Sequence, residues 1–356
     1  MQKVITILLV LLTAFRLPGC KSAPVEVENL DPLVHQALYD TTSSYYTDFS
    51  KYPKNIADLP IGIFGLGLSG AHTLDCAINL DSFDNITGGE NPDRIQDFAG
   101  EHIIFYTALG DADELYKDDG TMDIHDAAIK NTLFLVGDKC AQGEKERAKI
   151  VIAAGNITRD NGLKDIRRML EASESGVKVV GVVEEGVKTL LDELSSSPLL
   201  NCSVGLIADS LTIASGAYQQ MVKDVMAERG LKGNIPVVGQ RLNTSDTLAT
   251  RALSEAFSEM IESHFAAGMM SPICAIMADT DIDDSVKESF QEIINNYRSK
   301  RINGNYPYRS VINDKVFFID PSKCAAMECY RVLRSGNNLA LRIEGMQVAH
   351  YTDLPM

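Results

Sequence analysis

The sequence has no tryptophan, little cysteine and a deficit of positive charge. Seven cysteines among 356 residues are too few for a disulfide scaffold. The 33 Lys and Arg against 49 Asp and Glu give a formal net charge of -16. A surface of that sign repels phosphate backbones, so nucleic acid is excluded as an expected partner. The absence of tryptophan also disfavours a binder that stacks carbohydrate rings.

The remaining composition is that of a folded protein. Hydrophobic residues make up 45% and charged residues 23% of the chain, which is typical of globular rather than disordered sequences. The length fits one large α/β unit or two lobes of ordinary size. No short-period repeat is present, so a solenoid is not expected.

The N-terminus has the pattern of an export signal. Residues 1–19 hold an early lysine and an apolar run over residues 4–15, which predicts a secretory signal peptide. The ending Leu17-Pro18-Gly19-Cys20 resembles a bacterial lipobox, which implies cleavage before Cys20 and a lipid on its thiol. The alternative is an ordinary cleaved signal with Cys20 merely near the cut. Either way we expect export, with anchoring to a bacterial membrane on its periplasmic side or at the cell surface.

The body of the chain alternates short apolar runs with amphipathic segments. Runs with little polar alternation predict parallel strands covered on both faces, and stripes at helical spacing predict the helices between them. In such sheets the reactive groups follow the carboxyl ends of the strands. The expected strands are 61–64, 102–106, 150–154, 177–183, 203–208, 235–238, 272–278 and 316–319, and the clearest helices are 214–226, 248–265, 286–297 and 322–333.

Several strand ends, taken in order, resemble motifs of the aspartate/glutamate racemase superfamily, and glutamate racemase most of all. No single motif is decisive, but their order and spacing cover roughly residues 58–335. The matching segments are 61–70, 150–157, 180–188, 205–218, 277–281 and 318–321, together with Gly110-Asp111-Ala112 and Tyr116.

The resemblance implies a domain organisation. It predicts an α/β fold of two Rossmann-like (flavodoxin-like) lobes with parallel sheets and a cleft between them. Family members are often dimers, and they use no metal or pyridoxal cofactor, so a homodimer and no cofactor are expected. The predicted units are 20–57 as tether and N-terminal extension, 58–187 plus 305–336 as first lobe, 188–304 as second lobe and 337–356 as a C-terminal hairpin.

The resemblance also fails where the family's chemistry lies. Inverting an α-carbon needs a base on one face and an acid on the other, and the family uses two cysteines for this. Those positions hold Gly155 and Asp279 here. The opening-turn Asp and Ser positions hold Gly65 and Leu66, and a later His position holds Asp281. Inversion by two thiols is therefore excluded at these positions.

What remains is a set of candidate binding residues and one candidate base. Asp279 is the candidate catalytic residue, as a general base if it is desolvated, and the alternative is a solvated or helix-capping Asp. His72 either titrates beside the cleft or simply caps or packs its turn. The candidate ligand-binding residues implied by the resemblance are Gly65, Leu66, Tyr116, Asn156, Ile157, Ser215, Tyr218, Thr280 and Asp281.

Other residues and motifs give weaker evidence about function. Cys76, Cys202 and Cys274 are expected to be small buried hydrophobes. The histidines show no metal-ligand spacing, so no metal site is predicted. The Gly-x-Gly-x-x-Gly pattern over 65–70 matches a dinucleotide-binding fingerprint only loosely.

Two functions stay open. The loss of both thiols and the predicted export favour a lipoprotein that binds a small amino acid or carboxylic acid between its lobes without turnover. The alternative is a cofactor-independent amino-acid racemase of glutamate/aspartate type, or a lyase, with a rebuilt acid/base site.

Overall fold

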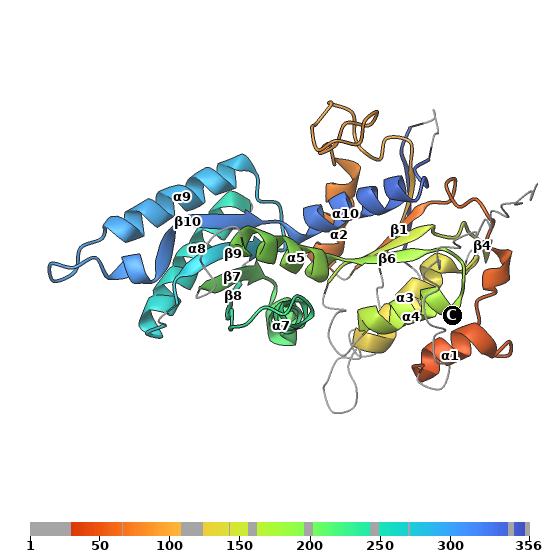
Figure 1. Ribbon diagram of the computed structural model, residues 1–356, viewed down its shortest axis with the longest axis horizontal. Helices are drawn as coiled ribbons and strands as arrows, with labels where there is room; N and C mark the ends of the chain where they lie inside the picture. The colour runs from red at the N-terminus through yellow and green to blue at the C-terminus, as the bar shows by residue number, and fades with distance from the viewer. Residues whose placement is uncertain are drawn as a thin grey trace, which may run out of the picture.

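The computed structural model describes residues 30–65, 67–107, 124–141, 143–155, 162–195, 202–242, 249–269, 271–340 and 345–352. Two parallel sheets lie one after the other along the long axis of the molecule, with helices against both (Figure 1). The predicted α/β class with two parallel sheets is confirmed.

The first sheet has five parallel strands in the order β11-β2-β1-β5-β6. Its central strands are continuous apolar runs because helices cover both faces. Helices α1 (Pro32–Tyr39), α3 (Ile124–Val136) and α4 (Gly162–Ala172) pack on one face, and α2 (Gly67–Ile78) and α10 (Pro321–Ser335) on the other. The strands are β1 (Ile61–Phe64), β2 (His102–Tyr106), β5 (Ile150–Ala153), β6 (Lys178–Gly181) and β11 (Gln347–Tyr351).

The second sheet has four parallel strands in the order β10-β9-β7-β8. These are β7 (Ser203–Ala208), β8 (Val237–Arg241), β9 (Ile273–Ala278) and β10 (Ile312–Ile319). Helices α5 (Val182–Ser195) and α7 (Ala217–Glu228) cover one face, and α8 (Ala249–Ala266) and α9 (Asp284–Ser299) the other. Smaller elements are α6 (Ser210–Ser215), the antiparallel pair β3 (Lys139–Cys140) and β4 (Gly143–Glu144), and 3-10 turns at Phe49–Lys51 and Pro307–Ser310.

Two helices cross between the sheets. Helix α5 follows β6 of the first sheet but packs on the second, and α10 follows β10 of the second sheet but packs on the first. The two lie against each other at the centre of the molecule (Figure 1). A Cβ at Gly186 of α5 would lie 2.7 Å from the Cβ of Pro321, so glycine permits this close approach. The chain thus links its two lobes twice.

Two predicted boundaries need correction. Strand β10 pairs with β9, so residues 312–319 belong to the second sheet, although 305–336 was predicted in the first lobe. The predicted C-terminal hairpin is wrong for the described residues 345–352, of which Gln347–Tyr351 form the single strand β11 parallel to β2. Its main chain extends the first sheet along the edge that β2 would otherwise expose.

A third correction concerns cysteine. Cys202 and Cys274 form a disulfide between sulfur atoms 2.09 Å apart, rather than standing as separate small hydrophobes. Cys202 lies directly before β7, and Cys274 lies in the neighbouring strand β9. The register that brings them together is set by the pairing of strands far apart in the chain, which local patterns do not reveal.

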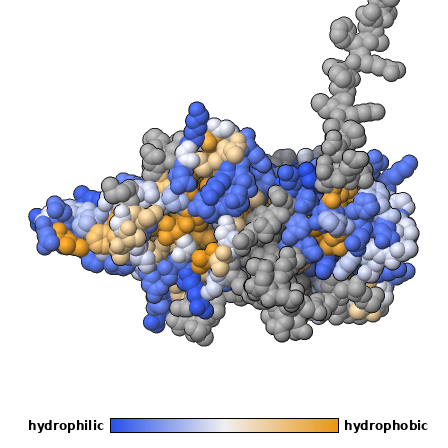
Figure 2. Space-filling model, turned by 90° about the horizontal axis from the view of Figure 1, so that it is seen from below, coloured by the Kyte–Doolittle hydropathy of each residue, from blue (hydrophilic) through white to orange (hydrophobic). Residues whose placement is uncertain are grey.

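One face of the surface mixes hydrophobic and hydrophilic residues. On the face shown in Figure 2, hydrophobic residues gather in separate patches among hydrophilic ones.

Among the described residues, none of the helices combines the length and the apolar character needed to cross a bilayer.

The turn from β1 into α2 is tightly packed at Gly65. A Cβ at this position would lie 2.6 Å from the Cα of Gly70 and 2.8 Å from the Cβ of Ala154. We expect Gly65→Ala to destabilise the protein by about 1–3 kcal/mol, the usual cost of overpacking. Urea unfolding checks this, with Gly89→Ala as control because a Cβ there has its first neighbours at 3.5 Å. Equal stability of the two variants would contradict the packing argument.

Candidate functional site

Polar side chains gather where the carboxyl ends of the second sheet's strands face helix α2 of the first lobe. Asp279 follows β9 and Asp320 follows β10, while Asp209 follows β7. Asp209 and Asp320 also cap helices, since their Oδ1 atoms accept from the backbone N–H groups of Thr212 (2.8 Å) and Lys323 (3.1 Å). The β-strand ends therefore deliver carboxylates to one edge, as parallel sheets commonly do.

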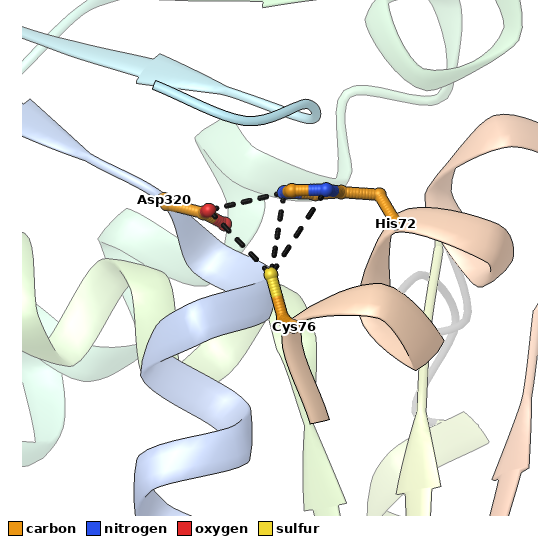
Figure 3. A group of neighbouring side chains, drawn as sticks. All are labelled: His72, Cys76 and Asp320. Carbon is orange, nitrogen blue, oxygen red and sulfur yellow. Dashed lines mark hydrogen bonds and ion pairs between the residues drawn. The ribbon is translucent and has the colours of Figure 1, made fainter. Parts of the chain in front are cut away.

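Helix α2 and Asp320 form a three-membered contact (Figure 3). The Nε2 atom of His72 lies 3.0 Å from Oδ2 of Asp320. The Sγ atom of Cys76 lies 3.5 Å from the same nitrogen and 3.7 Å from the same oxygen. Burial lowers the pKa of His72, but the hydrogen bond and charge of Asp320 outweigh it and raise that pKa overall. The group spans the two lobes.

A second contact holds the same helices together. The hydroxyls of Thr73 in α2 and Ser322 in α10 are buried and lie 2.9 Å apart. Since Ser322 comes two residues after Asp320, this bond fixes the start of α10 against α2. The two helices are therefore tied together at this point.

Asp279 is buried, with 8% of the residue exposed. Burial raises the pKa of its carboxyl to about 6, Ser69 and the charge of His72 lower it, and the charges of Asp209 and Asp320 raise it. Asp279 does not cap α9, because Asp283 caps that helix by accepting from the N–H of Val286 at 2.8 Å. The interpretation of Asp279 as a solvated residue or as the cap of α9 is therefore wrong.

Three buried polar atoms at this junction have no hydrogen-bond partner in the described part of the chain. They are Oγ of Ser69, the hydroxyl of Tyr218 and Oδ1 of Asp279. Ser69 is close enough to influence the Asp279 carboxyl, although their geometry is not that of a hydrogen bond. Burial raises the pKa of Tyr218 well above its usual value, and the charges of Asp279 and Asp320 add to this, so the Tyr218 hydroxyl is within electrostatic range of both carboxylates. Such atoms are rare in folded proteins, and here they offer donors and an acceptor to a ligand.

The charge of the junction is negative. The charged groups that most affect the pKa of Asp279 are His72, Asp209 and Asp320, and those that most affect Asp281 are His72 and further aspartates. Neither set includes a lysine or arginine within the described residues. This arrangement suits a protonated amine or a metal cation far better than an isolated carboxylate.

The other predicted site residues differ in their burial and in whether their polar groups are free to bind a ligand. Ser215 is buried, and its hydroxyl is used within its own turn. It donates to the carbonyl of Thr212 at 2.7 Å and accepts from the N–H of Ala217 at 3.2 Å. Thr280 is half-buried and Asp281 is exposed, and both follow β9 directly. Gly155 lies two residues after β5 and has a φ of 91°, and a Cβ there would have no neighbour within 4 Å. The predictions for Leu66, Tyr116, Asn156, Ile157 and Cys20 lie outside the described residues.

Sequence reasoning missed Ser69, Cys76 and Asp320 as members of the site. Cys76 is half-buried and packs against the hydrophobic core as a small hydrophobe would, but its Sγ also contacts His72 and Asp320, which the sequence did not predict. One signal was available, because His72 and Cys76 are four residues apart and thus share a helix face. No local signal joins them to Asp320, which lies 248 residues after His72.

Fold and site together define a two-lobed parallel α/β protein with an acidic, partly buried junction at its strand ends. No family model matches the chain, and the search of curated proteins also returned no match.

Solved structures similar to the chain include three glutamate racemases. That of Francisella tularensis subsp. tularensis, in complex with D-glutamate, is 21% identical, with 84% of this chain and 90% of that chain covered and a TM-score of 0.48. That of Bacillus anthracis (RacE1) is 14% identical over 82% and 86%, with a TM-score of 0.44. That of Campylobacter jejuni subsp. jejuni is 18% identical over 83% and 94%, with a TM-score of 0.42. Scores this low leave the function to be inferred from the site itself.

Proposed function

We propose that this protein binds a small amino acid at the junction of its two lobes without inverting it. The observation that carries this is that Ser69, Tyr218 and Asp279 each have a buried polar atom without a described partner, and that Asp279 interacts electrostatically with both of the others. The surrounding carboxylates favour a ligand with a protonated amine, which makes an amino acid a better fit than a plain carboxylic acid.

The absence of inversion follows from the distribution of acid/base groups. Racemisation needs a proton donor and an acceptor on opposite faces of the α-carbon. Asp279 supplies one such group, whereas Gly155 has no side chain. A ligand held beside Asp279 therefore lacks the second group of the family's pattern.

One observation favours an enzyme as the second candidate. Burial raises the pKa of Asp279 to about 6, which is near the pH at which a general acid or base works well. The neighbouring His72–Asp320 pair is a further proton-carrying group. A cofactor-independent racemase or lyase with a rebuilt site is therefore the alternative.

Export as a lipoprotein is part of the same proposal. The disulfide between Cys202 and Cys274 supports it, because such bonds persist mainly in oxidising compartments outside the cytoplasm. The lipid on Cys20, attachment to a bacterial membrane and a homodimer remain proposals that labelling of Cys20 and measurement of solution mass would test.

The ligand test combines binding with proton exchange. A panel of L- and D-amino acids is offered in deuterated water, with thermal shift and calorimetry for binding and α-carbon deuteration for catalysis. We expect saturable binding without deuteration, and Tyr218→Phe should weaken it about threefold to tenfold through the lost hydrogen bond. The matched control is Tyr308→Phe, since Tyr308 is equally buried but bonds Glu262 at the far end of the second lobe.

The outcomes separate the two candidates. Deuteration that disappears in Asp279→Asn would establish the enzyme and sink the non-inverting binder. An absence of both binding and deuteration across the panel would refute both.

A further inference from the structure

The group of His72, Cys76 and Asp320 has a use that the proposed function does not require. It brings an imidazole nitrogen, a thiol sulfur and a carboxylate oxygen within 4.8 Å of one another (Figure 3). We propose that these three side chains bind a divalent transition-metal ion of the zinc type. The sequence pattern predicted no metal, because only the tertiary structure adds Asp320 to the two helical residues.

The distances between the three donor atoms support the proposal. Zinc bonds of about 2.0–2.1 Å to nitrogen, 2.3 Å to sulfur and 2.0–2.2 Å to oxygen give tetrahedral edges of about 3.3 Å (N–O), 3.5 Å (N–S) and 3.5 Å (S–O). The observed separations are 3.0 Å, 3.5 Å and 3.7 Å in the same order. Shifts of a few tenths of an ångström would complete three corners of a tetrahedron and leave the fourth open.

The supporting contacts hold the donors in place. His72 and Cys76 project from successive turns of one helix face. Asp320 uses Oδ1 to cap α10 and turns Oδ2 toward both His72 and Cys76. The bond between Thr73 and Ser322 keeps α2 against α10. Outer contacts of this kind orient the ligands of protein metal sites.

The electrostatic setting and the donor types indicate which ion fits. The charges of Asp75, Asp279 and Asp281 reach this group and favour a cation. A mixed nitrogen, sulfur and oxygen set suits zinc, whereas magnesium and calcium prefer oxygen alone. Asp320 and Asp281 also line a surface depression of about 490 Å³, together with Lys287 and Lys323, so the carboxylate of the group borders solvent.

A second group of possible metal ligands lacks the features that support the first one. Asp31, His125 and Asp126 also lie within 4.8 Å of one another, but they offer no sulfur. Both ring nitrogens of His125 are already bonded to carboxylates, at 3.2 Å to Asp126 and 3.1 Å to Asp165. This group serves as an internal control.

The test uses the full chain after removal of metal with a chelator. Cobalt(II) is titrated first, because thiolate ligation gives a charge-transfer absorption and tetrahedral geometry gives intense visible bands; zinc is then added in competition. We expect one ion per chain with both signatures. Cys76→Ser should abolish the charge-transfer band, and His72→Gln or Asp320→Asn should weaken zinc binding by at least about 10- to 100-fold, the loss caused even by removing a ligand's outer partner.

Matched variants exclude trivial explanations. Asp320→Asn keeps an oxygen for the helix cap, so folding should survive. Cys324→Ser changes a half-buried cysteine of α10 outside the group, and His125→Gln changes the control group; both should leave the titration unaltered. No stoichiometric binding by the wild type, or a charge-transfer band that persists in Cys76→Ser, would overturn the proposal. The titration contains no amino acid, so its failure would leave the proposed amino-acid binding untouched. Equally, a failure of the amino-acid panel would leave the proposed metal site untouched.

Discussion

Replacing Asp279 by Asn should stabilise the metal-free protein at pH 8, and the gain should vanish in acid. The carboxyl has a pKa near 3.8 in the unfolded chain and about 6 in the folded one, chiefly because burial penalises its charged form. The native state thus binds the proton more tightly, so the stability that this group contributes is complete below pH 3.8 and is lost as the pH rises through 6. Asn has no charge to bury, and its advantage at pH 8 should approach about 3 kcal/mol as an upper limit.

Urea unfolding of both proteins between pH 4 and pH 8 in the presence of a chelator measures this. Asp75→Asn is the matched control, because it removes the same charge at an exposed position of α2 near the site. Its effect should be small, because an exposed carboxylate keeps its hydration in the folded state. If Asp279→Asn instead lowers stability at pH 8, the native carboxylate is favourably paired rather than desolvated.

Replacing Lys149 by Met should destabilise the protein more than any of the other substitutions. The side chain of Lys149 is fully buried, and its Nζ lies 2.6 Å from Oε2 of Glu101 and 2.6 Å from the carbonyl oxygen of Ala57. Glu101 also accepts from the backbone N–H of Ala340 at 2.7 Å. Removing the ammonium takes this counter-charge from a buried carboxylate, which typically costs about 3–5 kcal/mol.

This pair lies before β2 and β5, at the end of the first sheet opposite the candidate site. Lys287→Met is the matched control, since Lys287 pairs with the almost fully exposed Asp284 and should matter far less. The double variant Lys149→Met with Glu101→Gln should recover part of the loss, because neither member of the pair then carries a buried charge. A loss in Lys149→Met no larger than in the control would show that the pair contributes little to stability.

Local sequence patterns located the strands and helices well where one periodicity dominated. The strands expected at 61–64, 102–106 and 203–208 have those bounds in the structure. The run 177–183 was too long, because Val182 and Val183 begin the buried helix α5 and an apolar run does not distinguish a strand from such a helix. Strand β8 was placed too early, since its edge position admits the polar Gln240 and Arg241.

Helix boundaries also depend on features that local periodicity does not reveal. One helix was expected over 214–226, but Gly216 adopts a φ of 66° and separates α6 from α7. Asp279 was placed at a strand end by the sequence, but its burial and its raised pKa follow from the tertiary structure, which sets it near Ser69 and His72 of α2.

The sequence by itself determined the α/β class and the acidic character, and it carried the resemblance that predicts Gly155 and Asp279 at the positions of the racemases' two cysteines. The class follows from the periodicity of apolar residues, the acidic character from the composition, and the two residues from single positions of the sequence. The tertiary structure alone decided that β10 joins the second sheet, that Cys202 meets Cys274, and that Asp320 completes a group with His72 and Cys76. Each depends on strand register or helix packing between segments far apart in the chain, and such contacts arise from the closure of the whole fold rather than from any local pattern.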